Sequence, residues 1–346
     1  MNNRLNFSAD AYVRNTTDML VPGQTLPAVF GAASPQQNAG DLRTTGYELV
    51  LTWKDQLELK GKPLHYGISF VFGDATSEIT KYDNPNKLLA NHYVGKKWGE
   101  IWGYKIDGYF KSDEEAANWG IDQRLVNTQI QNAPGEWGRL RAGDLKFVDI
   151  NGDKAITPGK QTADDPGDMV ILGNSEPRYN YGVNANAGWN GLDLSIFLQG
   201  IGRRDWYPNN NADKYWGPYS RPYFSFLPKN FADLVWSEEN PDAYFPVLRG
   251  YTALNTGGCL RNPNDKYMQN IGYLRVKNLV IGYSLPNQWM KKLNVQRCRL
   301  YLSGENLFTW TPFETDYIDP EQPIADSQGR SYPLSRTLSV GLDITF

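Results

Sequence analysis

The last ten residues, TLSVGLDITF (337–346), alternate strictly between apolar and polar side chains. The apolar positions are Leu338, Val340, Leu342, Ile344 and Phe346. Because successive side chains of a strand point to opposite faces, this pattern predicts a strand with one apolar face and one polar face. Two kinds of protein end in such a strand. In a soluble β-sandwich its apolar face packs on a second sheet, and in an outer-membrane β-barrel it faces lipid.

The composition favours β-structure and argues against several classes of function. The 346 residues include 13% aromatics, 33 Gly and 21 Pro, which is typical of a strand-rich chain with many loops. A net charge of −3 gives no electrostatic footprint for nucleic acid. Two cysteines and two histidines leave no material for a disulfide framework or a cysteine zinc cluster. No hydrolase, P-loop or dinucleotide motif is found, so we expect no enzyme activity and no organic cofactor.

The absence of a long apolar run does not argue against a membrane protein. No segment has the roughly 18 consecutive apolar residues that a membrane helix needs. Barrel strands need only about 9–11 residues and keep one polar face, so hydropathy does not detect them. The first residues, MNNRLNFSADAY, lack a signal-peptide pattern and begin directly on strand-like alternation. We therefore expect a truncated chain.

Strand-like alternation recurs along the sequence. The clearest case is RYNYGVNANAGW (178–189), which has an aromatic residue at each end of its apolar face, as the strands of membrane barrels do. Asn190 and Gly191 follow and predict a two-residue hairpin turn. Further strands are predicted at 4–13, 46–53, 64–73, 192–200, 273–286 and 295–308.

Two irregularities in this pattern are informative. In the strand at 273–286, apolar residues occupy even positions before residue 277 and odd positions after it. Since a shift of one residue would turn every side chain to the other face, we predict a β-bulge near Lys277 and Asn278. The connections are also very unequal, because the segments 75–176 and 201–266 are long. Short turns at one end and long loops at the other are typical of outer-membrane barrels.

Several long segments together resemble one family. These segments are SADAYVRNTTDML (8–20), NAGDLRTTGYELVLTW (38–53), GDLKFVDINGDKAIT (143–157), GNSEPRYNYGVNANAGWNGLDLSIFLQG (173–200), YLRVKNLVIGYSLP (273–286) and LYLSGENLFTWT (300–311). In order and style they resemble the C-terminal part of SusC/RagA-type TonB-dependent transporters of Bacteroidota outer membranes. The resemblance extends over essentially the whole chain.

The resemblance implies an all-β fold and a transport function. Residues 1–346 would be about the last eight strands of a 22-stranded antiparallel transmembrane β-barrel with long extracellular loops, without the plug, the TonB box and the N-terminal extension. The complete protein would import oligosaccharides or peptides across the outer membrane. A SusD-like lipoprotein would cover it as a lid, and TonB would act through the missing N-terminal part. The alternative is a soluble β-sandwich that binds or cleaves glycans.

The resemblance also gives a role to the terminal strand. Leu338, Leu342, Ile344 and Phe346 match the terminal pattern, apolar at alternate positions with a final aromatic residue, that the barrel-assembly machinery reads.

The long loops are rich in aromatic residues, which suggests a contact surface. The candidates are Trp206, Tyr207, Trp216, Tyr219 and Tyr223, of which three lie in the segment 211–224. Such side chains stack on sugars, and they also dominate protein interfaces. The alternative is that they pack the loops against one another. All three interpretations remain open at this point.

The segment DINGDK (149–154) has the beginning of a calcium loop. Asp149, Asn151 and Asp153 stand at alternate positions, as the first ligands of such a loop do. Lys154 and Lys160 occupy the places of the usual glycine and of the bidentate glutamate. The alternative to bound calcium is an Asx-rich turn without metal.

Ionic residues within the predicted strands have restricted positions. A charged group on the lipid face near the bilayer midplane costs about 2–4 kcal/mol. We therefore expect the charged strand residues to face the lumen or to lie near the rims; they are Arg178, Arg275, Lys277, Arg299 and Glu305.

Overall fold

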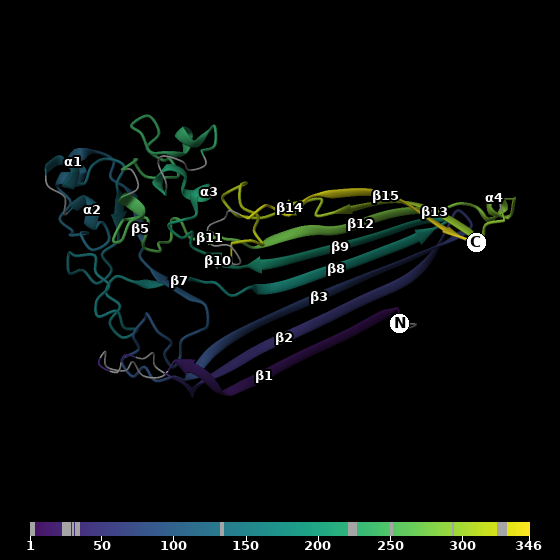
Figure 1. Cartoon of the computed structure of the whole chain (residues 1–346), viewed down its shortest axis with the longest axis horizontal. Helices are drawn as coiled ribbons and strands as arrows, with labels where there is room; N and C mark the ends of the chain where they lie inside the picture. The colour runs from purple at the N-terminus through teal and green to yellow at the C-terminus, as the bar shows by residue number, and fades with distance from the viewer. Residues whose placement is uncertain are drawn as a thin grey trace.

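The chain forms one long, curved antiparallel sheet that carries a folded body of loops at one end (Figure 1). This computed structural model describes residues 4–22, 29, 31, 35–131, 135–220, 227–249, 252–292, 294–323 and 331–346. No helix in these ranges is long and apolar enough to cross a membrane.

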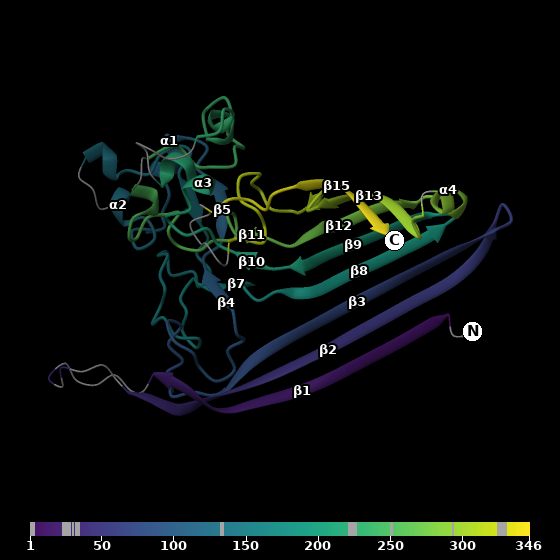
Figure 2. The ribbon, with the colours of Figure 1, turned by 45° about the vertical axis from the view of Figure 1, so that its right-hand side comes forward.

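Eight long strands make up the sheet, and each pairs antiparallel with the next one along the path. They are β1 (Leu5–Pro22), β2 (Gln36–Leu59), β3 (Lys62–Lys81), β8 (Arg178–Trp189), β9 (Leu192–Arg203), β12 (Tyr273–Ser284), β13 (Arg297–Glu305) and β15 (Thr337–Thr345). A short ninth strand, β14 (Thr309–Trp310), also pairs with β12. The expected antiparallel all-β architecture is therefore confirmed. β1 and β15 are the two edges, so the sheet is open (Figure 2).

The strand register gathers the apolar side chains on one face of the whole sheet. One row of directly paired residues consists of Phe7, Leu51, Phe70, Val183, Leu198 and Val276. Another row consists of Leu194, Ile281, Leu302 and Val340. Since side chains alternate between faces, the residues between these rows lie on the opposite face, which is mainly polar. We call the two surfaces the apolar face and the polar face.

Aromatic residues border the apolar face at both ends. Trp189 pairs with Leu64 at the end with short turns, and its indole nitrogen donates to the Leu59 carbonyl oxygen at 3.2 Å. At the loop end, the Phe72 ring lies between the rings of Tyr47 and Tyr179, with centroid distances of 6.0 and 6.4 Å. This arrangement is the one expected of the aromatic girdles of a membrane barrel.

The predicted bulge in β12 is confirmed. Val276 pairs with Leu198, and Asn278 pairs with the neighbouring Phe197, which leaves Lys277 as the extra residue. The bulge absorbs this extra residue, so the later apolar residues of β12 lie on the same face as the earlier ones. The apolar face is therefore continuous across the change of parity in the sequence.

The two ends of the sheet differ in their connections. At one end β8 and β9 are joined by Asn190 and Gly191, whose φ angles of 50° and 86° match the predicted tight turn. Lys60 and Gly61 join β2 and β3 in the same way, with φ angles of 51° and 70°. The connection from β12 to β13 contains the short helix α4 (Asn287–Lys292). The long segments 82–177, 204–272 and 306–336 all leave the opposite end.

The long connections fold into a separate body at that end of the sheet (Figure 1). We call the described residues of 82–177, 204–272 and 311–323 the loop body. Its elements are the paired strands β4 (Glu100–Gly103) and β7 (Val170–Asn174), β5 (Ile106–Tyr109) and β6 (Leu145–Phe147), and β10 (Asp205–Trp206) and β11 (Gln269–Asn270), the helices α1 (Asp113–Ala117), α2 (Thr128–Gln131) and α3 (Asp213–Trp216), and the 3-10 helices η2 (Gly135–Gly138), η3 (Gly217–Tyr219), η4 (Phe231–Leu234) and η5 (Thr252–Leu254).

The hydrophobic core lies in the loop body and not on the sheet. The buried cluster extends from Tyr104 to Ile318 and is dominated by aromatic residues of the loops. Apart from the long sheet, the strands of the described residues form only two-stranded pairs. The alternative of a soluble β-sandwich is therefore wrong, because no second large sheet formed by the described residues covers the apolar face.

Candidate functional site

The polar face of the sheet is hollowed toward its loop end. The larger hollow has a volume of about 620 Å³ and lies mainly on β2, β3, β8 and β9. Its polar and aromatic lining includes Tyr12, Glu48, Asn180, Asn184, Phe197 and Gln199. Asparagine and glutamine side chains both donate and accept hydrogen bonds, so this surface can bind uncharged groups that carry hydroxyls or amides.

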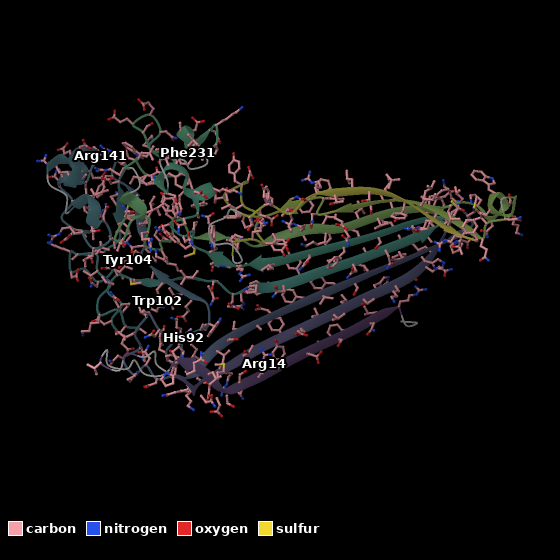
Figure 3. The ribbon with its side chains drawn as sticks, in the orientation of Figure 1. Arg14, His92, Trp102, Tyr104, Arg141 and Phe231 are labelled. Carbon is pink, nitrogen blue, oxygen red and sulfur yellow. The ribbon has the colours of Figure 1, made fainter. Side chains whose placement is uncertain are left out.

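A second hollow of about 260 Å³ continues the first one toward the loops and shares Tyr12 and Asn180 with it. This part adds three cationic side chains, Arg14, Lys97 and Arg178. Figure 3 shows Arg14 at the loop end of the first strand, below the loop body that contains Tyr104 and Phe231. The two hollows together form a polar trough that runs from the loops along the sheet, and we call it the polar trough.

Tyrosine rings cover glycines on the polar face, which explains why these positions have no side chain. Tyr12 lies directly opposite Gly46, and an added Cβ at Gly46 would meet the tyrosine ring at 2.6 Å. Tyr301 covers Gly341 in the same way, with a clash at 2.0 Å. Such pairs fill the space above a glycine and fix the strand register.

The charged strand residues lie where the sequence predicts them. Arg275, Arg299 and Glu305 are on the polar face by register, and Lys277, the bulge residue, reaches Glu321 on the same face as Arg275. Arg178 lies at the loop-end rim, where its Nε donates to Asp74 Oδ1 at 2.6 Å. None of these five charged residues lies in the middle of the apolar face, so the free-energy cost of placing an ion in lipid is avoided.

One ion cluster at the opposite end of the polar face links three strands. Arg299 donates from Nη2 to Asp193 at 2.6 Å and from Nη1 to Asp343 at 3.1 Å. The guanidinium group passes over Gly282, where an added Cβ would lie 2.5 Å from Arg299 Nε. This cluster holds β9, β13 and β15 together from the polar side.

The predicted contact aromatics lie mostly inside the loop body. Trp216 and Tyr219 have no exposed surface, and Trp206 is only 6% exposed. Tyr207 packs against the same core, and its hydroxyl donates to the Leu260 carbonyl oxygen at 2.7 Å. The packing interpretation is therefore the one that the structure supports, and an exposed surface formed by these four side chains is not what is found. Tyr223 lies outside the described residues, and a contact role for the set stays a prediction.

Buried tyrosine hydroxyls form a hydrogen-bonded network in the loop body. Tyr215 and Tyr244 are joined at 2.6 Å, and Tyr109 and Tyr267 at 3.0 Å. Gln269 Nε2 donates to the hydroxyls of Tyr215 and Tyr244 at 2.8 and 2.9 Å. Burial raises the pKa of Tyr244 to about 12, because the phenolate would lose its hydration.

A buried ion pair that the sequence did not indicate joins two distant loops. Arg249 donates from Nε to Asp144 Oδ1 at 3.0 Å and from Nη2 to Oδ2 at 2.5 Å. Its Nη2 also donates to the Arg139 carbonyl oxygen at 2.8 Å. Both charged side chains are about 95% buried. Because a buried charge is tolerated only with a partner, this pair fixes the loop that carries β6 against the segment at 249.

The candidate calcium residues form an Asx-rich turn. Asp149 accepts from the backbone nitrogens of Gly152 and Lys154 at 2.7 and 2.9 Å. Asn151 and Asp153 accept from backbone nitrogens two residues further on, at 3.0 and 2.8 Å. Lys154 has a φ of 65°, the conformation for which the usual glycine is suited. Within the described ranges, no group of three His, Cys, Asp or Glu side chains is arranged to hold a metal. Calcium binding stays a prediction.

The terminal strand presents its apolar residues on the apolar face. Leu338, Leu342 and Ile344 lie on the same face as the apolar residues of β13. Phe346 is 81% exposed at the end of the chain. β15 pairs with β13 on one side only. The position of these residues is compatible with recognition by an assembly machinery, which stays a prediction.

The sequence comparisons identify relatives of one kind. The chain is 27% identical to TonB-dependent receptor P26 of Formosa agariphila and 23% identical to TonB-dependent receptor SusC of Bacteroides thetaiotaomicron. Both similarities extend over 100% of this chain, but the chain spans only about a third of the length of these relatives, 33% and 30% respectively. No family model matches the sequence.

The structural comparison shows the same fold. A chain in a solved structure of the RagAB peptide transporter superposes with a TM-score of 0.65 at 23% identity. A structure of the RagAB peptide importer in an open state gives a TM-score of 0.66. In both cases all of this chain is matched, together with 33% of the other chain. The homologues are thus TonB-dependent receptors, which are outer-membrane β-barrel proteins, and the predicted resemblance is confirmed.

Proposed function

Because the homologues of this chain are TonB-dependent receptors, we propose that it forms part of the barrel wall and the extracellular loops of an outer-membrane nutrient importer. The complete machine imports oligosaccharides or peptides, and this segment contributes no covalent chemistry. Its apolar face contacts lipid, its polar face lines the lumen, and the polar trough lies along the path of the substrate.

The observation that carries this proposal is the apolar face itself. It continues through direct pairs across all eight strands, and its outer residues are strongly exposed, with Leu338 at 77% and Val340 at 79%. A surface of this size in water would cause aggregation. In a bilayer the same residues are in their preferred solvent, and every strand backbone inside the sheet is hydrogen-bonded.

The larger hollow of the polar trough supports import of a hydrogen-bonding substrate. Asn180, Asn184 and Gln199 offer amide donors and acceptors, and the Phe197 ring offers a flat apolar surface. Sugars present hydroxyls and C–H faces to such a site, and peptides present backbone amides. Of the similar proteins, RagAB is a peptide transporter. Because the same side chains can also bind sugars, both substrate classes remain in the proposal.

Two partners belong to the proposal. A SusD-like lipoprotein covers the loop body as a lid and captures the substrate before import. TonB acts from the periplasmic side on a part of the complete receptor outside these 346 residues. The packed core of the loop body supports this lid contact, because a surface that is already ordered loses little conformational entropy on association.

Uptake by cells that make the complete receptor tests the proposal. The double variant Asn184→Ala/Gln199→Ala removes two amides from the polar trough, and we expect uptake of one labelled class, oligosaccharide or peptide, to fall several-fold. The double variant Ser303→Ala/Ser339→Ala changes the polar face outside the trough and serves as the control. Normal uptake of both classes in the first variant, with normal assembly, would contradict the proposal.

A further inference from the structure

The connection between β13 and β15 folds over the polar face of the sheet. It first forms β14, which pairs with Leu274 and Arg275 of β12. Residues 311–323 then turn across the polar face, and Thr311 Oγ1 donates to the Gly272 carbonyl oxygen at 2.7 Å. We call residues 311–323 the acidic segment, because it contains Glu314, Asp316, Asp319 and Glu321 and no basic residue.

Two cationic residues of β12 bind the acidic segment. Arg275 Nη2 donates to both carboxylate oxygens of Asp319, at 2.8 and 2.7 Å, and its Nη1 lies 2.5 Å from Glu321 Oε1. Lys277 Nζ donates to both carboxylate oxygens of Glu321, at 2.8 and 2.9 Å. The Arg275 side chain is only 2% exposed, so the acidic segment removes it almost completely from water.

Local backbone geometry prepares both sides of this contact. On the acidic side, Asp319 Oδ1 accepts from the Glu321 nitrogen at 3.0 Å, which forms an Asx turn around Pro320 and sets the two carboxylates side by side. On the sheet side, the bulge at Lys277 places its side chain beside Arg275 on the polar face. The bulge therefore has a second effect besides keeping the apolar residues on one face.

The same segment is also part of the loop body. The Phe313 ring packs edge-on against Trp206 of β10, with a centroid distance of 5.7 Å. Gln269 Oε1 of β11 accepts from the Glu314 nitrogen at 3.3 Å. Ile318 is 3% exposed and belongs to the aromatic core. The acidic segment thus joins the core of the loop body to the wall of the sheet.

We propose that Arg275 and Lys277 are positioning residues that lock the acidic segment to the lumen wall and thereby hold the loop body in place over the mouth of the barrel. This inference rests on the proposed function, in which the polar face lines the lumen. The physical reason is that buried charges are stable only when they are paired. Loss of the Asp319 carboxylate leaves Arg275 with only the carboxylate of Glu321, which Lys277 shares, so two largely buried cations face one anion. The segment must then move away so that water can reach the guanidinium group.

A labelling experiment on the receptor in intact cells tests the lock. Ile318→Cys introduces a cysteine, and the rate of its reaction with a membrane-impermeant maleimide is measured. The protein without the added cysteine gives the background rate. We expect slow labelling while the pairs are intact. Asp319→Asn should raise the labelling rate by about tenfold or more, since local opening depends on the free energy of the contacts that hold the segment. Tyr317→Cys, at a position that is 39% exposed, gives the reference rate for an accessible site.

Control variants separate the lock from general damage. Lys277→Arg keeps the charge, and we expect it to keep the slow labelling. Asp193→Asn breaks the other ion cluster of the polar face, at Arg299, and should also leave labelling at residue 318 unchanged. If Asp319→Asn prevents assembly, Glu321→Gln provides the milder test, because the Glu321 side chain is 24% exposed.

The outcomes distinguish this inference from the proposed function. Slow labelling of residue 318 in both Asp319→Asn and Glu321→Gln, in barrels that migrate as folded species in unheated gels, would overturn the lock. The measurement requires no transport. A failure to import either substrate class would therefore count against the proposed function and leave the lock standing.

Discussion

The loop body buries its apolar residues, whereas the sheet exposes its apolar residues on one face. In the loop body, Trp216 and Tyr219 have no exposed surface and pack among other aromatic rings. In the sheet, Leu338 and Val340 are more than three-quarters exposed on an apolar face that nothing in the described structure covers. One chain therefore contains a region built for water beside a region built for lipid.

The two regions obtain their stability from different sources. The loop body has its own hydrophobic core, which is the usual source of stability in water. Among the described residues the sheet has no core of its own, and in the proposed function it depends on hydrogen bonds between strands and on contact with the bilayer. Apart from the contact between β12 and the acidic segment, changes in one region should therefore have little effect on the other, and four predictions test this separation.

Insertion of one alanine between Leu279 and Val280 should have the largest effect. The added residue would turn Ile281 and Tyr283 from the apolar face to the polar face, because a shift of one residue reverses the facing of every later side chain. We expect loss of barrel assembly, measured as the folded species in unheated gels. Val280→Ala keeps the residue count and serves as the control. Normal assembly of the insertion variant would show that the pairing with β9 does not set the register of β12.

The variant Trp216→Ala should destabilise the loop body alone. Truncation of a fully buried large aromatic residue costs about 3–5 kcal/mol. We expect faster proteolysis of the loops and no change in the folded barrel in gels. Trp98→Ala is the matched control, because Trp98 is 41% exposed. Equal protease resistance in both variants would contradict the separate core.

Arginine substitutions at neighbouring positions of β9 should differ in cost. Ile196→Arg places a charge on the apolar face and should reduce folding stability in lipid vesicles by about 2–4 kcal/mol. Ser195→Arg places it on the polar face, next to water, and should cost little. The two effects are compared by denaturant titration in vesicles. Equal costs would show that the two faces do not meet different solvents.

Alkaline pH should have the smallest effect and should act on the loop body first. Burial raises the pKa of Tyr104 and Tyr244 to about 12, above the ordinary value of 10.0. Because the folded pKa is higher, the associated stability is fully present below pH 10 and is lost as the pH rises from 10 to 12. Tyrosinate absorbance should show a late-ionising group of tyrosines in the folded protein. Titration of all tyrosines near pH 10 would contradict the buried network.

The strands that face lipid were predictable from the sequence. Their alternation is a local property, and even the bulge at Lys277 was visible as a change of parity. The ends of the first three strands were not predictable. The expected segments 46–53 and 64–73 are parts of β2 and β3, which have 24 and 20 residues. Beyond the apolar band both faces contact polar surroundings, so alternation fades while the hydrogen bonds continue.

The candidate site was harder to predict from the sequence than the strands, because it depends on contacts between distant segments. The burial of Trp216 follows from its neighbours Phe245 and Tyr267, and no local pattern indicates them. The pair of Asp144 and Arg249 spans 105 residues. The trough residues Asn184 and Gln199 are on the expected polar parity, but only the register between strands brings them together.

A cysteine accessibility scan along β8 would test directly whether one face of the sheet meets lipid and the other meets water. Each residue from 181 to 188 is replaced in turn in the outer membrane, and its label is exposed to a water-soluble quencher and to a lipid-soluble quencher. We expect a period of two, with Val183, Ala185 and Ala187 reached from lipid and Asn184 and Asn186 reached from water. Access from water at every position would contradict a lipid-facing barrel wall.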